Sequence, residues 1–341
     1  MNDPHRTILT ESVDAAHAQE PQAAEPSRRP SAQRPRLLLS LALLLALLPV
    51  AGVRSLAHQR HRTAQERTRT VLLTIKRQAA WDALQRDLRE EIARFGGEVG
   101  LVVEDFRTGW RFAYQADHRI AAASLIKVPI MVACLEAEAR GKVNLSEPLT
   151  LRGADKVLGT GILKASPNGT TWTIRQLLEL SITRSDNTAT NLLIERMGLA
   201  SFDARFAKLD LKDTNLSRRM MDFSHRRQGV ENYTSAEDIA LLLSRTYRQK
   251  GVAQSTAVQG LEFLKQQRLR DRIPKKLPEG IVVAHKTGLE RYVCHDAGIV
   301  FSPQGDFAIT VLTKSRHRTA APAKALIARL ALRVYTYVAG T

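Results

Sequence analysis

The stretch Ala121-Ala-Ala-Ser-Leu-Ile-Lys-Val-Pro-Ile130 places Ser124 and Lys127 inside an apolar run, and Ser-x-x-Lys occurs once in the chain. The run predicts a long helix over residues 121–138, on which Lys127 lies one turn along from Ser124 on the same face. A serine hydroxyl becomes a good nucleophile only when a nearby base takes its proton. A lysine can be that base if burial or a neighbouring cation lowers its pKa.

Each residue also has a purely structural interpretation. Ser124 could simply cap the helix, and Lys127 could be an exposed helical lysine. The apolar side chains on both sides of Lys127 bury this turn, where an idle lysine would be costly. We therefore predict that Ser124 is a nucleophile and Lys127 its base.

A second motif, Ser185-Asp-Asn187, supplies a hydroxyl and an amide. Ser185 can relay a proton between Lys127 and a leaving nitrogen, and Asn187 can hold the amide of a substrate. Ser185 and Asp186 also stand just before a predicted helix, residues 188–197, where either can act as an N-cap. Capping and catalysis are compatible at this position.

A third motif, Lys286-Thr-Gly288, follows an apolar, β-branched stretch. We expect Lys286 and Thr287 at the end of a strand, where a cation and a hydroxyl can receive a substrate carboxylate. Lys286 can also be the cation that lowers the pKa of Lys127. Gly288 would let the backbone approach a ligand closely, and Arg291 is either a second positive charge for the substrate or an exposed loop arginine.

The three motifs, in this order, resemble the signature of class A β-lactamases and penicillin-binding proteins, and the resemblance covers residues 81–341. It implies an α+β fold, with an antiparallel sheet flanked by N- and C-terminal helices and an all-helical domain inserted at about 141–274. It also implies an acyl-enzyme on Ser124, with Lys127, Ser185 and Lys286 as further catalytic residues. The backbone N–H groups of Ser124 and Leu289 would form the oxyanion hole. The family needs no cofactor or metal.

The chain departs from class A β-lactamases at the glutamate that activates the deacylating water. That family carries a Glu-x-x-x-Asn pattern on its Ω-loop, and the corresponding residues 218–232 lack it. Asp222 is the first substitute that we consider and Glu231 the second. Asp222 can instead pair with Arg218 or Arg226, and Glu231 can merely precede the next helix. The sequence therefore supports acylation better than rapid hydrolysis.

Periodicity gives the order of the remaining elements. We expect a helix, two strands, a helical middle, three strands and a closing helix, and the Thr173-Ile-Arg-Gln176 sequence has the form of a capping box. The predicted ranges are 81–95 for the first helix, 99–104, 110–114, 281–287, 297–301 and 307–313 for the strands, 234–249 for a middle helix and 320–338 for the last helix.

The N-terminal segments differ from the rest in composition. Residues 1–36 are poor in large apolar side chains and predict a disordered cytoplasmic tail. Residues 37–53 carry no charge. The length of this uncharged segment is at the lower limit for a membrane span, and the segment therefore predicts a signal anchor. Cleavage after the small-x-small sequence Ser55-Leu-Ala57 is the alternative. Residues 54–80 read as a basic linker. The expected substrates place the catalytic domain outside the cytoplasm, in a bacterial envelope or periplasm.

The chain has 341 residues, 44% of them hydrophobic, and a net charge of +17. Its basic runs, residues 245–250 and 268–276, lack stacking aromatics or a nucleic-acid-binding motif. We interpret these runs as solvated surface and expect no nucleic-acid partner. An alternative function for them is attraction to anionic envelope polymers or lipid head groups. Cys134 predicts a buried thiol. Two cysteines make neither a disulfide framework nor a metal site.

The sequence thus predicts a membrane-anchored, extracytoplasmic serine acyl-hydrolase with a monomeric catalytic domain, acting on β-lactams or related acyl-D-amino-acid amides. One alternative is a penicillin-binding D,D-peptidase-like enzyme that acylates and deacylates slowly. Another is a non-catalytic envelope-binding protein on the same fold.

Overall fold

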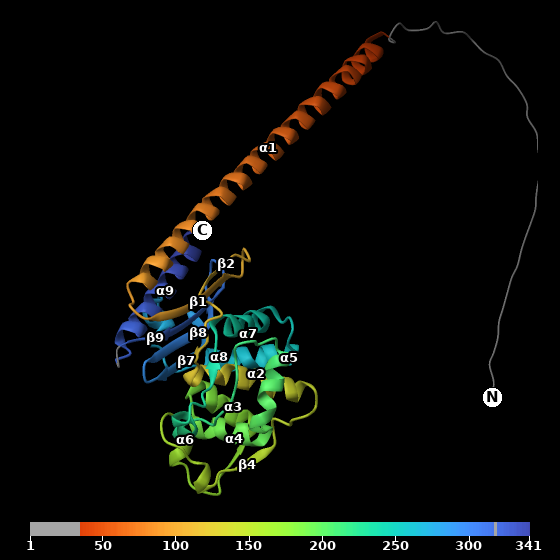
Figure 1. The fold of residues 1–341 in the computed structure, drawn as a ribbon. Coiled ribbons are helices and arrows are strands. Elements are labelled where there is room, and N and C mark those ends of the chain that lie inside the picture. The colour runs from red at the N-terminus through yellow and green to blue at the C-terminus, as the bar shows by residue number, and fades with distance from the viewer. Residues whose placement is uncertain (1–34, 317–318) are drawn as a thin grey trace, which may run out of the picture. The chain divides into compact units, whose positions relative to one another are not determined.

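The computed structural model describes the backbone of residues 35–316 and 319–341, and side chains from residue 58 onward. The chain divides into two compact units, Met1–Val71 and Leu72–Thr341. Helix α1 (Pro35–Ala93) contributes to both. Figure 1 shows the second unit as a sheet with helices on its two faces.

Helix α1 is longer than expected, because the predicted linker 54–80 is helical throughout. No proline or glycine, the strongest helix breakers, occurs between Arg54 and Ala93. The predicted signal anchor, residues 37–53, lies outside the residues whose side chains are described. Among the helices that could be assessed in the described part, none is long and apolar enough to cross a membrane.

The sheet of the second unit contains five antiparallel strands in the order β2-β1-β9-β8-β7. The N-terminal strands therefore join the C-terminal strands in one sheet, as the family resemblance implied, and the α+β prediction is confirmed. Strand β7 lies at one edge. The strands are β1 (Glu98–Asp105), β2 (Arg111–Tyr114), β7 (Val282–Glu290), β8 (Val293–Phe301) and β9 (Phe307–Lys314).

Two apolar cores cover the two faces of this sheet. The C-terminal part of α1 and helix α9 (Ala321–Gly340) form one, with Trp81, Leu88 and Leu330 buried against the strands. The other face carries α7 (Ala236–Arg248) and α8 (Gln254–Lys265), against which α2 (Lys127–Ala139) packs (Figure 1). This second core continues into the helical part of the molecule.

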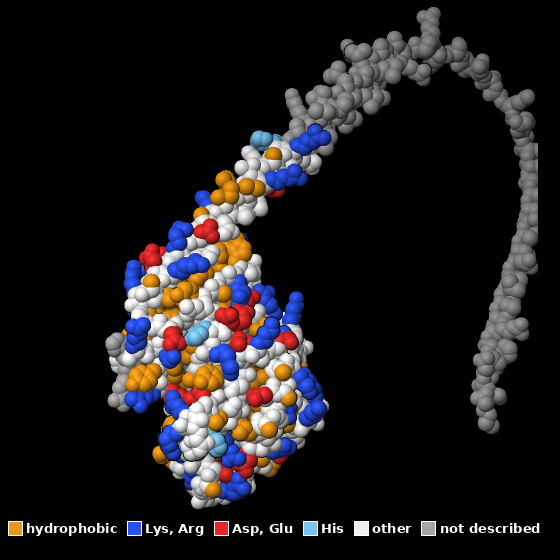
Figure 2. All heavy atoms as spheres, in the orientation of Figure 1, with side chains coloured by type: hydrophobic (Ala, Val, Ile, Leu, Met, Phe, Trp, Pro, Cys, Tyr) orange, Lys and Arg blue, Asp and Glu red, His pale blue; other side chains and the backbone are white. Residues whose placement is uncertain are grey.

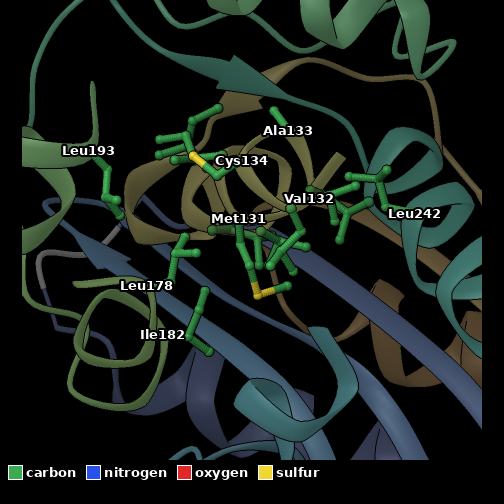
Figure 3. Close-up of a cluster of buried hydrophobic side chains, with 14 of the residues drawn as sticks. Met131, Val132, Ala133, Cys134, Leu178, Ile182, Leu193 and Leu242 are labelled. Carbon is green, nitrogen blue, oxygen red and sulfur yellow. The ribbon is translucent and has the colours of Figure 1, made fainter. Parts of the chain in front are cut away.

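Helix α2 lies at the centre of the helical part. Its Met131, Val132 and Cys134 are buried, and the neighbouring apolar side chains come from three further helices, as Figure 3 shows for Leu178, Ile182, Leu193 and Leu242. Cys134 is a buried free thiol, as predicted. The other elements of this part are β3 (Ile120–Ala121), β4 (Pro148–Thr150), β5 (Thr171–Thr173), α3 (Ile174–Thr183), α4 (Asn187–Met197), α5 (Phe202–Lys208), α6 (Phe223–Arg227) and β6 (Tyr233–Thr234).

The hairpin of β7 and β8 differs from the prediction. Strand β8 begins at Val293, four residues earlier than predicted, and its polar residues His295 and Asp296 are fully buried in the sheet. Strand β7 continues to Glu290. Lys286 and Thr287 therefore lie within the strand, and their placement at its end was wrong.

Charge is spread over the surface of the second unit. In Figure 2, the basic side chains on the visible face are interspersed with acidic ones. The solvated interpretation is confirmed for Arg268, Arg270, Lys275 and Lys276, which are exposed. It is wrong for Arg272, which is only 1% exposed.

Candidate active site

Ser124 lies in a short 3₁₀ turn, Ala123–Ile126, that leads into α2. The preceding Ala123 has φ +45°, a strained value for alanine that recurs at functional sites. Gly288 of β7 packs directly on this turn, because a Cβ on it would lie 3.2 Å from Leu125 N and 3.3 Å from Ala122 O. The close approach expected of Gly288 is therefore made to the nucleophile's own turn.

Lys127 is completely buried. Its Nζ donates to Ser185 O at 2.7 Å, to Asn187 Oδ1 at 2.8 Å and to Ser185 Oγ at 3.3 Å, and none of these acceptors belongs to Ser124. Burial lowers the pKa of Lys127 well below its usual value, and the charge of Lys286 lowers it further, partly opposed by Asp186. A neutral amine one turn from Ser124 is a usable base.

Ser185 links two lysines. Its Oγ accepts a hydrogen bond from Lys286 Nζ at 3.0 Å, besides the longer one from Lys127. Its φ of +53° is another strained backbone value in the site. Burial, and next the charge of Arg272, lowers the pKa of Lys286 to about 7, opposed by Asp296. The hydroxyl thus has a titratable amine on each side, which suits a proton relay.

Asp186, and not Ser185, is the N-cap of α4. The hydroxyl of Ser185 is therefore not needed for capping and can serve as a proton relay. Asp186 Oδ1 accepts from Ala189 N at 2.9 Å as the N-cap of α4, and Oδ2 accepts from Ile162 N at 2.6 Å and Leu163 N at 2.9 Å. The carboxylate therefore fixes both the start of α4 and the loop that lies over it.

The side chain of Asn187 is engaged at both ends. Its Oδ1 accepts from Lys127, and its Nδ2 donates to Leu158 O at 3.3 Å. In this structure Asn187 positions the base, and its contact with a substrate amide stays a prediction.

A cavity of about 910 Å³ opens in front of Ser124. Lys127 and Lys286 are buried outside its lining, whereas Ser185, which accepts from both amines, lines it. The predicted site residues that line it are Ser124, Ser185, Asn187, Glu231, Thr287, Leu289 and Arg291.

Neither substitute for the missing glutamate is free. Glu231 Oε1 accepts from Arg218 Nη2 at 2.6 Å, and its Oε2 lies 3.2 Å from Arg226 Nε. Asp222 does not line the cavity. It accepts from Ser224 Oγ at 2.6 Å and lies 2.7 Å from His225 Nδ1. The hydrogen bond from Ser224 is the main cause that lowers the pKa of Asp222 to about 2. The alternative, in which Asp222 pairs with Arg218 or Arg226, was wrong, because its partners are Ser224 and His225.

Some residues of the cavity escaped the sequence reasoning. Arg272 lines it, donates from Nε to Cys294 Sγ at 3.2 Å, and lies 3.1 Å from Asp271. Arg272 belongs to the basic run 268–276, whose other four cations are exposed. Sequence spacing alone does not predict which cation of the run is buried. Met220, Met221, Phe223 and Glu290 line the cavity as well.

This arrangement can move an acyl group onto a serine and then to water, so the fold and the site define a serine acyl-hydrolase. The chain belongs to the β-lactamase enzyme family, whose sequence model matches residues 83–338. A β-lactamase of Streptomyces albus G is 28% identical over 247 residues, which cover 68% of this chain and 77% of that protein.

Two solved structures are similar over most of their length. A β-lactamase from Sphaerobacter thermophilus is 29% identical, with a TM-score of 0.69 over 76% of this chain and 98% of its own. PBP-A is 27% identical, with a TM-score of 0.70 over 76% of this chain and 97% of its own. A mutant of PBP-A has been solved as an acyl-enzyme complex with penicillin G.

Proposed function

We propose that this protein is a membrane-anchored, extracytoplasmic serine hydrolase that β-lactams, or related acyl-D-amino-acid amides, acylate at Ser124. The observation that carries the proposal is the hydroxyl of Ser185, held between the buried amines of Lys127 and Lys286 behind the cavity that Ser124 faces.

Acylation uses these groups in turn. Lys127 takes the proton of Ser124, directly or through Ser185, and Ser124 Oγ forms a bond to the carbonyl carbon of the amide. The carbon–nitrogen bond of the amide then breaks. The leaving nitrogen receives a proton from Ser185, which regains one from a lysine. The backbone N–H groups of Ser124 and Leu289 are the family's donors to the developing oxyanion.

The substrate carboxylate has a binding place beside this machinery. Thr287 offers a hydroxyl to the cavity, and Arg272 and Lys286 place positive charge behind it. Charge-assisted hydrogen bonds to a carboxylate are about twice as strong as neutral ones. The site therefore suits an anionic amide, such as a β-lactam or a peptide that ends in a D-amino acid.

Deacylation lacks an evident base. The three carboxylates that line the cavity are all in ion pairs: Glu231 with Arg218 and Arg226, Glu290 with Arg226, and Asp271 with Lys324. This favours the second candidate, a penicillin-binding D,D-peptidase-like enzyme with slow turnover, and the likeness to PBP-A supports it. A general base is worth about 10²–10⁴-fold in rate.

One experiment separates the candidates. The purified full-length protein in detergent is mixed with a fluorescent penicillin, and both the covalent label and the released product are followed. We expect one equivalent of label in a fast burst, then a slow phase. Linear turnover without a burst would favour an efficient β-lactamase with a base not yet identified. The absence of any label would leave a non-catalytic binding protein.

A further inference from the structure

A loop that carries two glycines packs on the Ser-Asp-Asn motif. Gly159 has φ +89°, and a Cβ on it would lie 2.7 Å from Asn187 Nδ2. Gly161 has φ +114°, and a Cβ on it would lie 2.2 Å from Asp186 Cγ. Glycine adopts this backbone conformation readily and leaves room for so close an approach. The two glycines therefore let the residue between them, Thr160, reach the backbone of the motif.

Thr160 makes two hydrogen bonds to the motif. Its Oγ1 donates to Ser185 O at 2.6 Å, and its own O accepts from Asn187 N at 3.1 Å. Thr160 also lines the catalytic cavity. A hydroxyl has one hydrogen to donate, and the carbonyl of Ser185 accepts it here. The side chain of Thr160 is therefore bound to the motif rather than left open for a ligand.

The acceptors of Lys127 are the groups that this loop holds. Lys127 Nζ makes its two shortest hydrogen bonds to Ser185 O at 2.7 Å and to Asn187 Oδ1 at 2.8 Å. Thr160 donates to the first of these acceptors, and Leu158 O accepts from Asn187 Nδ2 at 3.3 Å. Ser185 has φ +53°, a strained value that its surroundings must maintain. The positions of both acceptors thus depend on the loop.

The two acceptors decide where the lone pair of Lys127 points. A neutral amine has two hydrogens and one lone pair. When the hydrogens are donated to Ser185 O and Asn187 Oδ1, the remaining contact, with Ser185 Oγ at 3.3 Å, is the one at which the amine can accept a proton. A general base must lie within hydrogen-bond reach of the proton that it takes. Fixing the two acceptors therefore aims the base at the proton relay.

We propose that Thr160 is a positioning residue for acylation, whose hydroxyl holds the carbonyl of Ser185 so that Lys127 presents its lone pair to the relay. Thr160 acts through Ser185 and Lys127 and not on the substrate. This inference rests on the proposed function, because it assumes that Ser124 is acylated and that Lys127 is the base.

The test removes the hydroxyl and keeps the shape of the side chain, in Thr160→Val. Acylation of the full-length protein in detergent is followed at several concentrations of benzylpenicillin, which gives the rate constant at saturation and the half-saturating concentration. We expect the rate constant to fall about 3- to 10-fold, the effect of one hydrogen bond. The half-saturating concentration should change less than about twofold, because the lost interaction acts on the base and not on substrate binding.

Two further variants and a matched control complete the series. Thr160→Ser keeps the hydroxyl and should stay within about twofold of the unchanged protein, whereas Thr160→Ala lacks it and should lose rate as Thr160→Val does. Thr170→Val is the control, since Thr170 Oγ1 donates to Pro167 O at 2.9 Å and Thr170 does not line the cavity. Both of its constants should be unchanged. Partial unfolding lowers the amount of label but not the rate constant, so it cannot imitate the effect.

Thr160→Val and Thr160→Ala variants that acylate as fast as the unchanged protein would overturn the positioning role. A raised half-saturating concentration at an unchanged rate constant would also overturn it, because Thr160 would then act on the substrate. In both cases acylation would still support the proposed function. An unchanged protein that benzylpenicillin does not acylate would overturn the proposed function and this inference together.

Discussion

At the scale of single residues, the chemistry depends on two fully buried lysines. Lys127 and Lys286 are each 0% exposed, and Ser185 Oγ lies between them. Burial disfavours the charged form of an amine, and the charge of Lys286 further disfavours that of Lys127. The pKa of each amine is thereby lower than that of an exposed lysine, which favours the neutral, basic form.

The pH dependence of acylation follows from the lowered pKa of Lys127. A lysine acts as a base when it is neutral, and an ordinary lysine titrates near pH 10.4. Because burial and Lys286 lower the pKa of Lys127, its neutral form persists to lower pH than that of an ordinary lysine, and activity is lost on the acid side. We expect the acylation rate constant at saturating penicillin to change less than about threefold between pH 7 and pH 9. A tenfold rise per pH unit over this range would show an ordinary lysine and contradict the assignment.

At the scale of elements, the carboxylate of Asp186 connects α4 to the loop above it. It accepts one hydrogen bond from the first turn of α4 and two from Ile162 and Leu163. Loss of an N-cap costs about 0.5–2 kcal/mol, and a buried N–H without a partner costs about 1–3 kcal/mol.

We therefore expect Asp186→Ala to lower the free energy of unfolding by about 2–4 kcal/mol in urea denaturation. The matched control is Asp210→Ala, because Asp210 has a side chain that is 67% exposed and pairs only with Arg245 among the partners found. That variant should change the free energy by less than about 1 kcal/mol. Equal losses in the two variants would show that Asp186 does not anchor the loop.

The sequence predicted some elements better than others. Periodicity found α9 and the capping box of α3, whose Thr173 accepts from Gln176 N at 3.2 Å. It ended β7 at residue 287 rather than Glu290 and began β8 at residue 297 rather than Val293, because Gly288, Glu290, His295 and Asp296 do not look like strand residues until their partners across the sheet are known.

The same limit applies to the site. Ser124, Lys127, Ser185 and Lys286 could be assigned to one site because the three motifs resemble a family signature, whereas each motif alone fixes only its local geometry. The pairing of Glu231 with arginines and the burial of Arg272 depend on tertiary contacts that no local pattern carries.

At the scale of the whole molecule, the residues 37–53 lead us to propose attachment to a membrane. We expect the full chain to sediment with membranes, and a variant without residues 1–53 to remain in the supernatant. Protease added to spheroplasts should digest the catalytic unit and spare a cytoplasmic control protein. A catalytic unit that stays protected until the membrane is lysed would contradict the topology, and with it the class of substrate.

The central claim is that Ser124 is the residue that becomes acylated, and intact-mass measurement after exposure to benzylpenicillin tests it most directly. The unchanged protein should gain the mass of one penicillin, and Ser124→Ala should gain none. Lys127→Ala should be labelled about 10²–10⁴-fold more slowly, because the serine has lost its base. An adduct of the same mass on Ser124→Ala would contradict the account.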